Sequence, residues 1–164
     1  MGRRWVMDAS PLILLNKINH LDLLSKLSEE IIVPRAVADE LLSYEEDRPA
    51  WDTFFLSSPK IVRLQDALQI SADVSGWGLG KGESEVISYA MANTGCEAVL
   101  DDLDARKCAA TFNIPLRGTV GIILLAKQKN ILPAAKPLIE ALKVAGLRFS
   151  EDWIKSALNL VGED

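Results

Sequence analysis

The feature that most constrains this chain is a series of very short, mostly apolar runs separated by helix-like segments. The runs lie at 5–7, 30–33, 60–64, 98–100 and 114–116. Strands that are apolar on both sides are typical of a parallel sheet that helices cover on both faces, because neither face meets water. We therefore predict an α/β fold, a three-layer α/β/α sandwich around a central, mainly parallel sheet.

Helix signals lie between these runs. Ser10 precedes Pro11, which predicts a helix that Ser10 caps, and Pro34 suits the first turn of the helix after the second strand. We expect Thr119 to cap a helix and Ser150 to open another. The periodic spacing of apolar residues is less clear over 43–59, and it is least regular over 65–81. We expect this stretch to be a surface loop whose mobility stays open. Further helices are predicted over 20–27, 83–93, 101–111, 134–145 and 151–160.

The size of the chain sets its domain organisation. It has 164 residues, of which 49% are hydrophobic and 25% charged, close to the globular average. One domain of this length buries about 70% of its unfolded surface without disulfides or a structural metal. We predict a single domain over 1–164, with 131–164 as a C-terminal helical extension packed on it.

Charge and cysteine usage narrow the function classes. A formal charge of −5 argues against a protein that binds nucleic acid through a broad basic surface, although bound cations could supply positive charge locally. Cys96 and Cys108 lack the spacing of metal ligands, and we interpret them as reduced thiols. The apolar stretch that follows the basic start ends at Asp8, which is too early for a signal peptide. No apolar run approaches the ~18 residues of a membrane span. We expect a cytoplasmic protein without a membrane segment.

Acidic residues follow two of the predicted strands directly. Asp8 comes after 5–7, and Asp101 and Asp102 come after 98–100. Ligands of open parallel sheets bind beyond the carboxyl ends of the strands. We therefore expect these carboxylates to meet at one edge of the sheet.

Two further acids could reach that edge. Glu83 opens a helix after a glycine-rich segment, and Glu40 lies two turns into the helix after Val33. Clustered carboxylates without matching cations repel one another unless a hard cation neutralises them. Oxygen ligands suit Mg²⁺ or Mn²⁺, which could activate water and stabilise charge on a phosphate.

Each acid also has a purely structural interpretation. Asp8 could cap a helix, but Ser10 is expected to fill that place. Asp101 and Asp102 at a helix start complement the helix dipole, and Glu83 could do the same. Glu40 taken alone is interpreted as a solvent-exposed helix residue. Their joint placement favours a functional site.

Other catalytic motifs are incomplete in this sequence. The glycine-rich segment around Lys81 resembles a phosphate-binding loop, but Gly82 stands where that motif needs Ser or Thr. His20 alone cannot form a zinc site, and no Gly-x-Ser-x-Gly elbow is present. Nucleotide P-loop, zinc and serine-hydrolase chemistry are therefore disfavoured.

Five short motifs in order resemble those of the PIN-domain nucleases, most closely the prokaryotic branch akin to toxins of toxin-antitoxin pairs. The motifs are Val6–Ile13, Val33-Pro34 with Val37 and Glu40-Leu41, Gly82–Ile87, Leu100–Asp102 with Ala105-Arg106, and Arg117–Gly121. The likeness runs from about 6 to 126, and the 146–150 segment also resembles that branch.

The resemblance implies a PIN-like fold and metal-dependent hydrolysis of RNA phosphodiesters with Mg²⁺ or Mn²⁺. It also implies a homodimer that a partner antitoxin neutralises. By position, the acidic set is Asp8, Glu40, Glu83 and Asp101, with Asp102 as an alternative or additional metal ligand; Ser10 and Thr119 match supporting positions. Glu83 departs from the commoner aspartate.

Alternatives to the nuclease stay open. The chain could be a catalytically silent PIN-fold module that acts through a protein partner, with its acids serving as helix caps. A phosphoryl-transfer enzyme would want a second aspartate where Ser10 stands. For a nuclease, sequence preference must come from residues outside the metal site. Candidates for that surface are 65–81, Arg106, Lys107 and Arg117.

Overall fold

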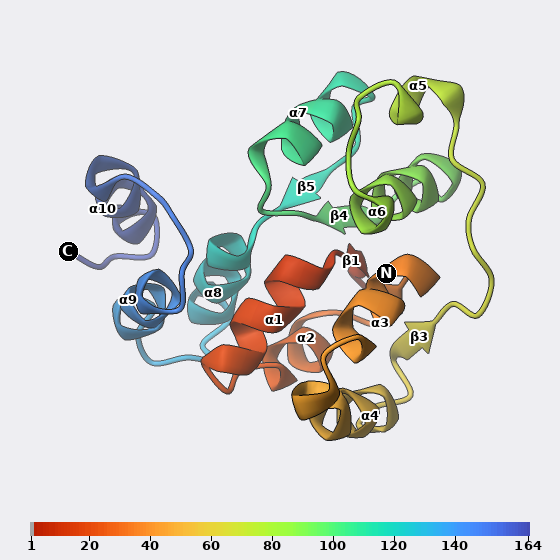
Figure 1. Cartoon of the computed structure of the whole chain (residues 1–164). Coiled ribbons are helices and arrows are strands. Elements are labelled where there is room, and N and C mark those ends of the chain that lie inside the picture. Colours follow the sequence, from red (N-terminus) through yellow and green to blue (C-terminus); the bar gives the residue numbers. More distant parts are fainter. Residues whose placement is uncertain (1) are drawn as a thin grey trace.

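The computed structural model describes residues 2–164 and contains one sheet of five parallel strands in the order β3-β2-β1-β4-β5 (Figure 1). The strands are β1 (Arg4–Met7), β2 (Glu30–Val33), β3 (Ile61–Arg63), β4 (Glu97–Val99) and β5 (Leu116–Arg117). Helices cover both faces of this sheet. The predicted three-layer α/β/α sandwich with a parallel sheet is therefore confirmed.

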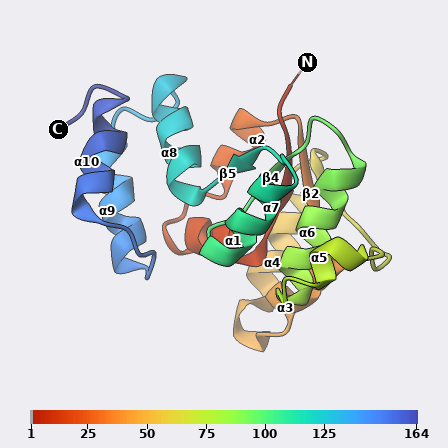
Figure 2. The same ribbon diagram turned by 90° about the horizontal axis from the view of Figure 1, so that it is seen from above.

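The helices fall into two layers. α8 packs against both α1 and α2 on one face, and α6 and α7 cover β1, β4 and β5 from the other (Figures 1 and 2). α3 lies between α1 and α6. The helices are α1 (Ala9–Lys17), α2 (Asp22–Leu27), α3 (Arg35–Leu42), α4 (Arg48–Leu56), α5 (Ala72–Ser75), α6 (Lys81–Ala92), α7 (Leu103–Thr111), α8 (Thr119–Gln128), α9 (Lys136–Val144) and α10 (Glu151–Asn159), with a 3₁₀ turn at Glu45–Asp47.

The central strand explains the apolar run near the start of the chain. Val6 is paired with Ile32 of β2 on one side and with Ala98 of β4 on the other. The side chains of Trp5, Val6 and Met7 are all fully buried, because helices cover both faces of β1. A strand in this position has no face for a polar side chain, so alternation is absent.

The last two helices pack beyond α8 at one side of the molecule (Figure 2). Leu142 of α9 and Leu158 of α10 are buried and belong to the same apolar cluster as the sheet. The connection follows the sequence signals. Gly146 adopts a φ of +115°, which ends α9, and the hydroxyl of Ser150 accepts a hydrogen bond from the Trp153 N–H at the start of α10.

Two segments hold more structure than the sequence indicates. The loosely patterned 43–59 segment contains α4, which buries Trp51 and Phe54 with their rings edge to face at 5.8 Å. The 65–81 segment contains α5, capped by Ser71, with Val74 fully buried. Most of this segment is exposed, as expected of a surface loop, but the buried Val74 and the Glu85 carboxylate of α6 anchor it.

Two predicted helix caps are also wrong. α1 begins at Ala9, so Asp8 takes the cap position and Ser10 lies exposed inside the first turn. α8 begins at Thr119 itself, with Gly118 at the cap position. In both cases the helix starts earlier than its polar residue suggested. The freed side chain of Thr119 then has another partner, described below.

The longest helix within residues 2–164 is α6, with 12 residues. None of the described helices therefore has the length and apolar character needed to cross a bilayer.

Candidate active site

The strand order places a crevice between β1 and β4. From β1 the chain moves to β2 on one side, whereas β4 and β5 lie on the other side of β1. Crossovers that leave in opposite directions open a crevice at the carboxyl ends of the two strands, where ligands of open parallel sheets bind. Asp8 follows β1 and Asp101 lies two residues after the end of β4, so the fold brings both carboxylates to this crevice.

Asp8 is the most buried acid of the crevice. Its backbone N–H donates to the Val99 carbonyl at 3.1 Å, which continues the pairing of β1 with β4, and only 6% of the residue is exposed. Burial raises the pKa of the Asp8 carboxyl to about 7, and the charges of Glu83, Glu40 and Asp101 add to the rise, while the Ala9 N–H opposes it. A carboxylate in this position is costly to ionise alone.

Asp101 and Asp102 have different hydrogen-bond partners. The Asp101 carboxylate accepts from the Thr119 N–H at 2.9 Å and from its hydroxyl at 2.5 Å. Asp102 is the cap of α7 and accepts from the Ala105 N–H at 2.9 Å. The structural interpretation therefore applies to Asp102, whereas Asp101 is held by a neighbouring helix in a fixed orientation.

Gly82 in the first turn of α6 lies next to two of the acids. A methyl group in place of its hydrogen would lie 3.5 Å from Asp8 Oδ1, 3.7 Å from Glu40 Oε2 and 3.2 Å from Val37. The small residue thus lies between the Asp8 carboxylate and that of Glu40, which reaches over from α3. An alanine there would touch both carboxylates at ordinary contact distances and press on Val37.

Glu83 completes the group from the first turn of α6. Partial burial raises the pKa of its carboxyl to about 7, with further contributions from the negative charges of Asp102, Glu40 and Asp104. Its Oε2 is buried and has no hydrogen-bond partner within residues 2–164. Buried polar atoms are normally paired, so this oxygen points to a ligand or cation in the crevice.

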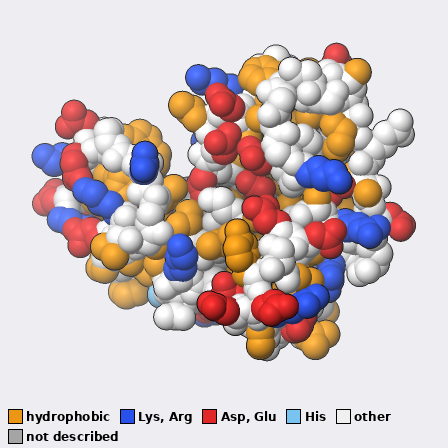
Figure 3. Space-filling view, in the orientation of Figure 1, with side chains coloured by type: hydrophobic (Ala, Val, Ile, Leu, Met, Phe, Trp, Pro, Cys, Tyr) orange, Lys and Arg blue, Asp and Glu red, His pale blue; other side chains and the backbone are white. Residues whose placement is uncertain are grey.

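These carboxylates line one cavity of about 800 Å³. Acidic side chains form a band across the middle of the corresponding face in Figure 3. Two cations, Lys81 and Arg148, lie at the cavity margin, and no ion pair joins either to a site carboxylate in the part of the chain described. The acids that line the cavity are Asp8, Glu40, Glu83, Asp101 and Asp102, and Ser10 lines it as well.

The candidate ligand atoms of the crevice are of the type that a hard divalent cation binds. All candidate ligands are carboxylate oxygens, which Mg²⁺ and Mn²⁺ prefer. Glu83 Oε2 has no hydrogen-bond partner within residues 2–164, and burial raises the pKa of Asp8, so a cation would favour the ionised form that burial disfavours. Among residues 2–164, however, no three such side chains already stand in a metal-binding arrangement. The carboxylates would have to converge further to hold an ion.

Sequence reasoning missed Glu85. This carboxylate is 4% exposed and accepts from the Ala36 N–H and the Leu68 N–H, both at 2.7 Å. It thereby fixes the start of α3, which carries Glu40, and the 65–71 segment. No signal in the sequence separates Glu85 from Glu83, because only the packing of α6 shows which carboxylate faces α3 and which faces the crevice.

Two arginines that the sequence offers for substrate recognition also make contacts within the protein. Arg106 donates to the Leu100 carbonyl at 2.8 Å and so braces the turn that carries Asp101. The guanidinium of Arg117 binds Glu97 instead of facing the carboxylates. Arg148, which sequence reasoning did not single out, lines the crevice from the segment between α9 and α10.

Comparison with known proteins agrees with this geometry. No curated protein matches the chain. A family model described as a PIN domain matches residues 4–163, nearly the whole chain. Proteins of this kind are generally nucleases that use divalent metal ions. The chain therefore belongs to the PIN-domain family.

Proposed function

We propose that this protein is a metal-dependent endoribonuclease that hydrolyses RNA phosphodiesters through Asp8, Glu40, Glu83 and Asp101. The observation that carries the proposal is the convergence of these carboxylates in one crevice, where the pKa of Asp8 rises to about 7. Such strongly perturbed groups cluster at functional sites. Family membership supports nuclease chemistry in general.

Asp8 and Asp101 would hold a Mg²⁺ or Mn²⁺ ion, with Asp102 as a further ligand. Such an ion supplies positive charge for the phosphate and makes a water molecule more acidic. Asp8 gains most from the ion, because a nearby cation favours the ionised form that burial disfavours. Asp101 needs little reorganisation, since Thr119 already orients it.

In this proposal Glu40 and Glu83 accept a proton from the attacking water. The pKa of Glu83, raised to about 7, is close to the value that suits a general base at neutral pH. Glu40 is exposed and reaches the crevice from α3, which the Glu85 hydrogen bonds hold in place.

The C-terminal segment supports substrate binding in this proposal. We propose that residues 131–164 form an extension of the single domain and that Arg148 contacts phosphate beside the carboxylates. The support is that Leu147 and Arg148 line the same cavity as Asp8. The arginine would compensate part of the negative charge that otherwise repels RNA.

The biological setting is also a proposal. Resemblance to prokaryotic toxins supports a homodimeric toxin with a partner antitoxin. A cytoplasmic location is supported by Cys96 and Cys108, both buried and free of disulfides.

The decisive experiment compares Asp8→Asn with wild type in an RNA cleavage assay with Mn²⁺. Loss of cleavage with retained folding is the expected result, and Asp52→Asn, an exposed change on α4, is the matched control. Equal cleavage by Asp8→Asn and wild type would remove Asp8 from the mechanism.

A catalytically silent binding module is the second candidate. It is favoured by the finding that Asp102 acts as a helix cap and by the lack of a ready metal arrangement within residues 2–164. Isothermal titration of Mn²⁺ separates the two functions. Stoichiometric binding that depends on Asp8 supports the nuclease, and its absence supports the binding module.

A further inference from the structure

A second large cavity lies at the opposite edge of the sheet from the carboxylates. It has a volume of about 910 Å³, and much of its wall comes from residues at or before the amino ends of strands, including Arg3, Ser28 and Gly95. Lys60 precedes β3, and Lys129 comes from the end of α8. Six of its lining residues are cationic and two are acidic, although the whole chain carries a net charge of −5.

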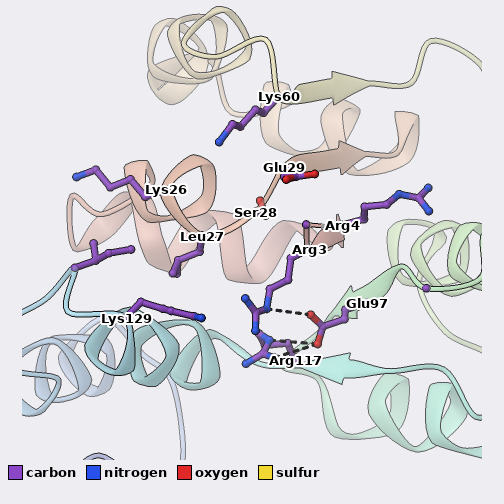
Figure 4. A pocket seen from close by; sticks show the side chains of 13 residues that line it. Arg3, Arg4, Lys26, Leu27, Ser28, Glu29, Lys60, Glu97, Arg117 and Lys129 are labelled. Carbon is purple, nitrogen blue, oxygen red and sulfur yellow. Dashed lines mark hydrogen bonds and ion pairs between the residues drawn. The ribbon is translucent and has the colours of Figure 1, made fainter.

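One carboxylate organises two arginines in this cavity. Glu97 accepts from the Trp5 indole at 3.0 Å and from the Arg117 guanidinium at 3.3 and 3.2 Å, and Arg3 lies 3.8 Å from its other oxygen. Figure 4 shows Arg3 and Arg117 meeting at Glu97. Two guanidinium charges share a single carboxylate, so one positive charge is left for another anion.

Two lysines extend the positive surface. In Figure 4, Lys60 and Lys129 reach toward the cavity from opposite sides, whereas Arg4 and Lys26 point away from it. The Lys129 ammonium makes no hydrogen bond or ion pair within residues 2–164, and the Lys60 ammonium donates only to the Ser25 carbonyl. Both ammonium groups thus keep their charge uncompensated by protein carboxylates.

Helix dipoles explain only part of this arrangement. Lys129 at the end of α8 complements the negative end of that helix. Arg3 and Arg117 lie on or beside strands, where no such reason applies, and Lys60 comes from a loop. Four inward cations oppose Glu29 and Glu97, which leaves an excess of about two positive charges at this cavity.

We propose that this cavity binds a phosphate group, either of a nucleotide or of the terminal phosphate of an RNA strand. A phosphate monoester carries close to two negative charges at neutral pH, which matches the excess. Guanidinium groups recognise phosphate through paired N–H donors. Glu97 holds the guanidinium groups of Arg3 and Arg117 in position at this cavity. The volume is also typical of small-molecule sites. The proposal is independent of the nuclease chemistry at the other edge.

The test measures binding of pyrophosphate, ADP and a 5′-phosphorylated RNA decamer by isothermal titration in EDTA, which keeps metal ions from recruiting phosphate to the carboxylates. The test variant is Lys60→Glu with Lys129→Glu, both exposed. The matched control is Lys17→Glu with Lys155→Glu, which makes the same charge change at exposed positions on α1 and α10.

We expect wild type and the control to bind, and the test variant to bind at least tenfold more weakly. Binding of ADP and pyrophosphate assigns the cavity to a nucleotide. Binding of the 5′-phosphorylated decamer alone, with the 5′-hydroxyl decamer at least tenfold weaker, assigns it to an RNA terminus. No binding of any probe at millimolar concentration, equal loss in the control, or undiminished binding by the test variant overturns the proposal.

Discussion

Thr119 holds Asp101 with both of its donors. Its backbone N–H reaches Asp101 Oδ1 at 2.9 Å and its hydroxyl reaches Oδ2 at 2.5 Å, so the first residue of α8 sets the direction of a carboxylate that follows β4. Thr119 is itself fully buried. The position of α8 therefore decides which of two adjacent aspartates faces the crevice in a fixed rotamer.

Thr119→Val tests this relationship, because valine keeps the shape and the N–H but removes the hydroxyl. We expect metal affinity or RNA cleavage to fall by about tenfold or more, as for other residues that orient metal ligands. Stability should fall by only about 1 kcal/mol. Thr53→Val on α4, which loses a hydroxyl bonded to the Pro49 carbonyl, is the control and should cleave normally. Full activity in Thr119→Val would contradict the assigned role.

Asp8 makes the stability of the metal-free protein depend on pH. The pKa of its carboxyl is 3.8 when exposed and about 7 in the folded protein, so the folded chain keeps a proton that the unfolded chain releases between these values. Unfolding then releases protons, and stability falls as pH rises from about 4 to about 7. The loss is roughly 4 kcal/mol at most, at about 1.4 kcal/mol per pKa unit.

Urea unfolding of wild type and Asp8→Asn in EDTA checks this dependence. The variant should be more stable than wild type at pH 8, and the advantage should shrink toward pH 4. Mn²⁺ should stabilise wild type more than the variant at pH 8, because binding to the folded state adds to stability. A pH-independent difference between the two proteins would show that Asp8 is not the titrating group.

The adjacent residues Asp101 and Asp102 can be distinguished by their different structural roles. Asp102→Asn should fold and keep the cap of α7, because asparagine is also a good cap, whereas Asp102→Ala should lose about 1 kcal/mol. Asp101→Asn should abolish Mn²⁺ binding with little loss of stability. Calorimetric titration and thermal melting of the three variants distinguish the roles. Unchanged Mn²⁺ binding by Asp101→Asn would transfer the ligand role to Asp102.

Glu85→Ala should destabilise the fold, because it leaves the Ala36 and Leu68 N–H groups without their partner. A loss of about 3 kcal/mol is expected for two such groups. Limited proteolysis should also cut the 65–71 segment faster. The control Glu140→Ala removes an exposed carboxylate of α9 and should leave unfolding nearly unchanged. If both variants unfold alike, the carboxylate does not anchor the segment.

Gly118→Ala should disturb the site through a close contact. A methyl group there would lie 3.1 Å from the Arg106 guanidinium and 3.2 Å from Asp101 Oδ1, so one of them must shift. We expect RNA cleavage to fall, with a stability loss of about 1–2 kcal/mol. Gly76→Ala meets only ordinary contacts of 3.5 and 3.8 Å and is the matched control. Equal activities of the two variants would show that Asp101 tolerates displacement.

Several errors of the sequence reasoning share one cause. Ser10 and Thr119 look like helix caps, yet each lies inside its helix, because the preceding strand delivers the chain directly into a helical turn. The α4 segment lacks a clean apolar period, yet Trp51 and Phe54 bury it against the domain. Local patterns predict that an element exists, whereas its exact start depends on the neighbours it packs against.

The sequence by itself determined the parallel α/β fold and the edge at which Asp8 and Asp101 lie. Both follow from local facts, since an apolar run must be a buried strand and the residue after it must stand at the strand's carboxyl end. Only the tertiary structure decided that Asp101 is held by Thr119, that Glu85 is an anchor, and that Arg3 and Arg117 share Glu97. Such side chains come from segments far apart in the chain, and their direction is set by packing that no local pattern records.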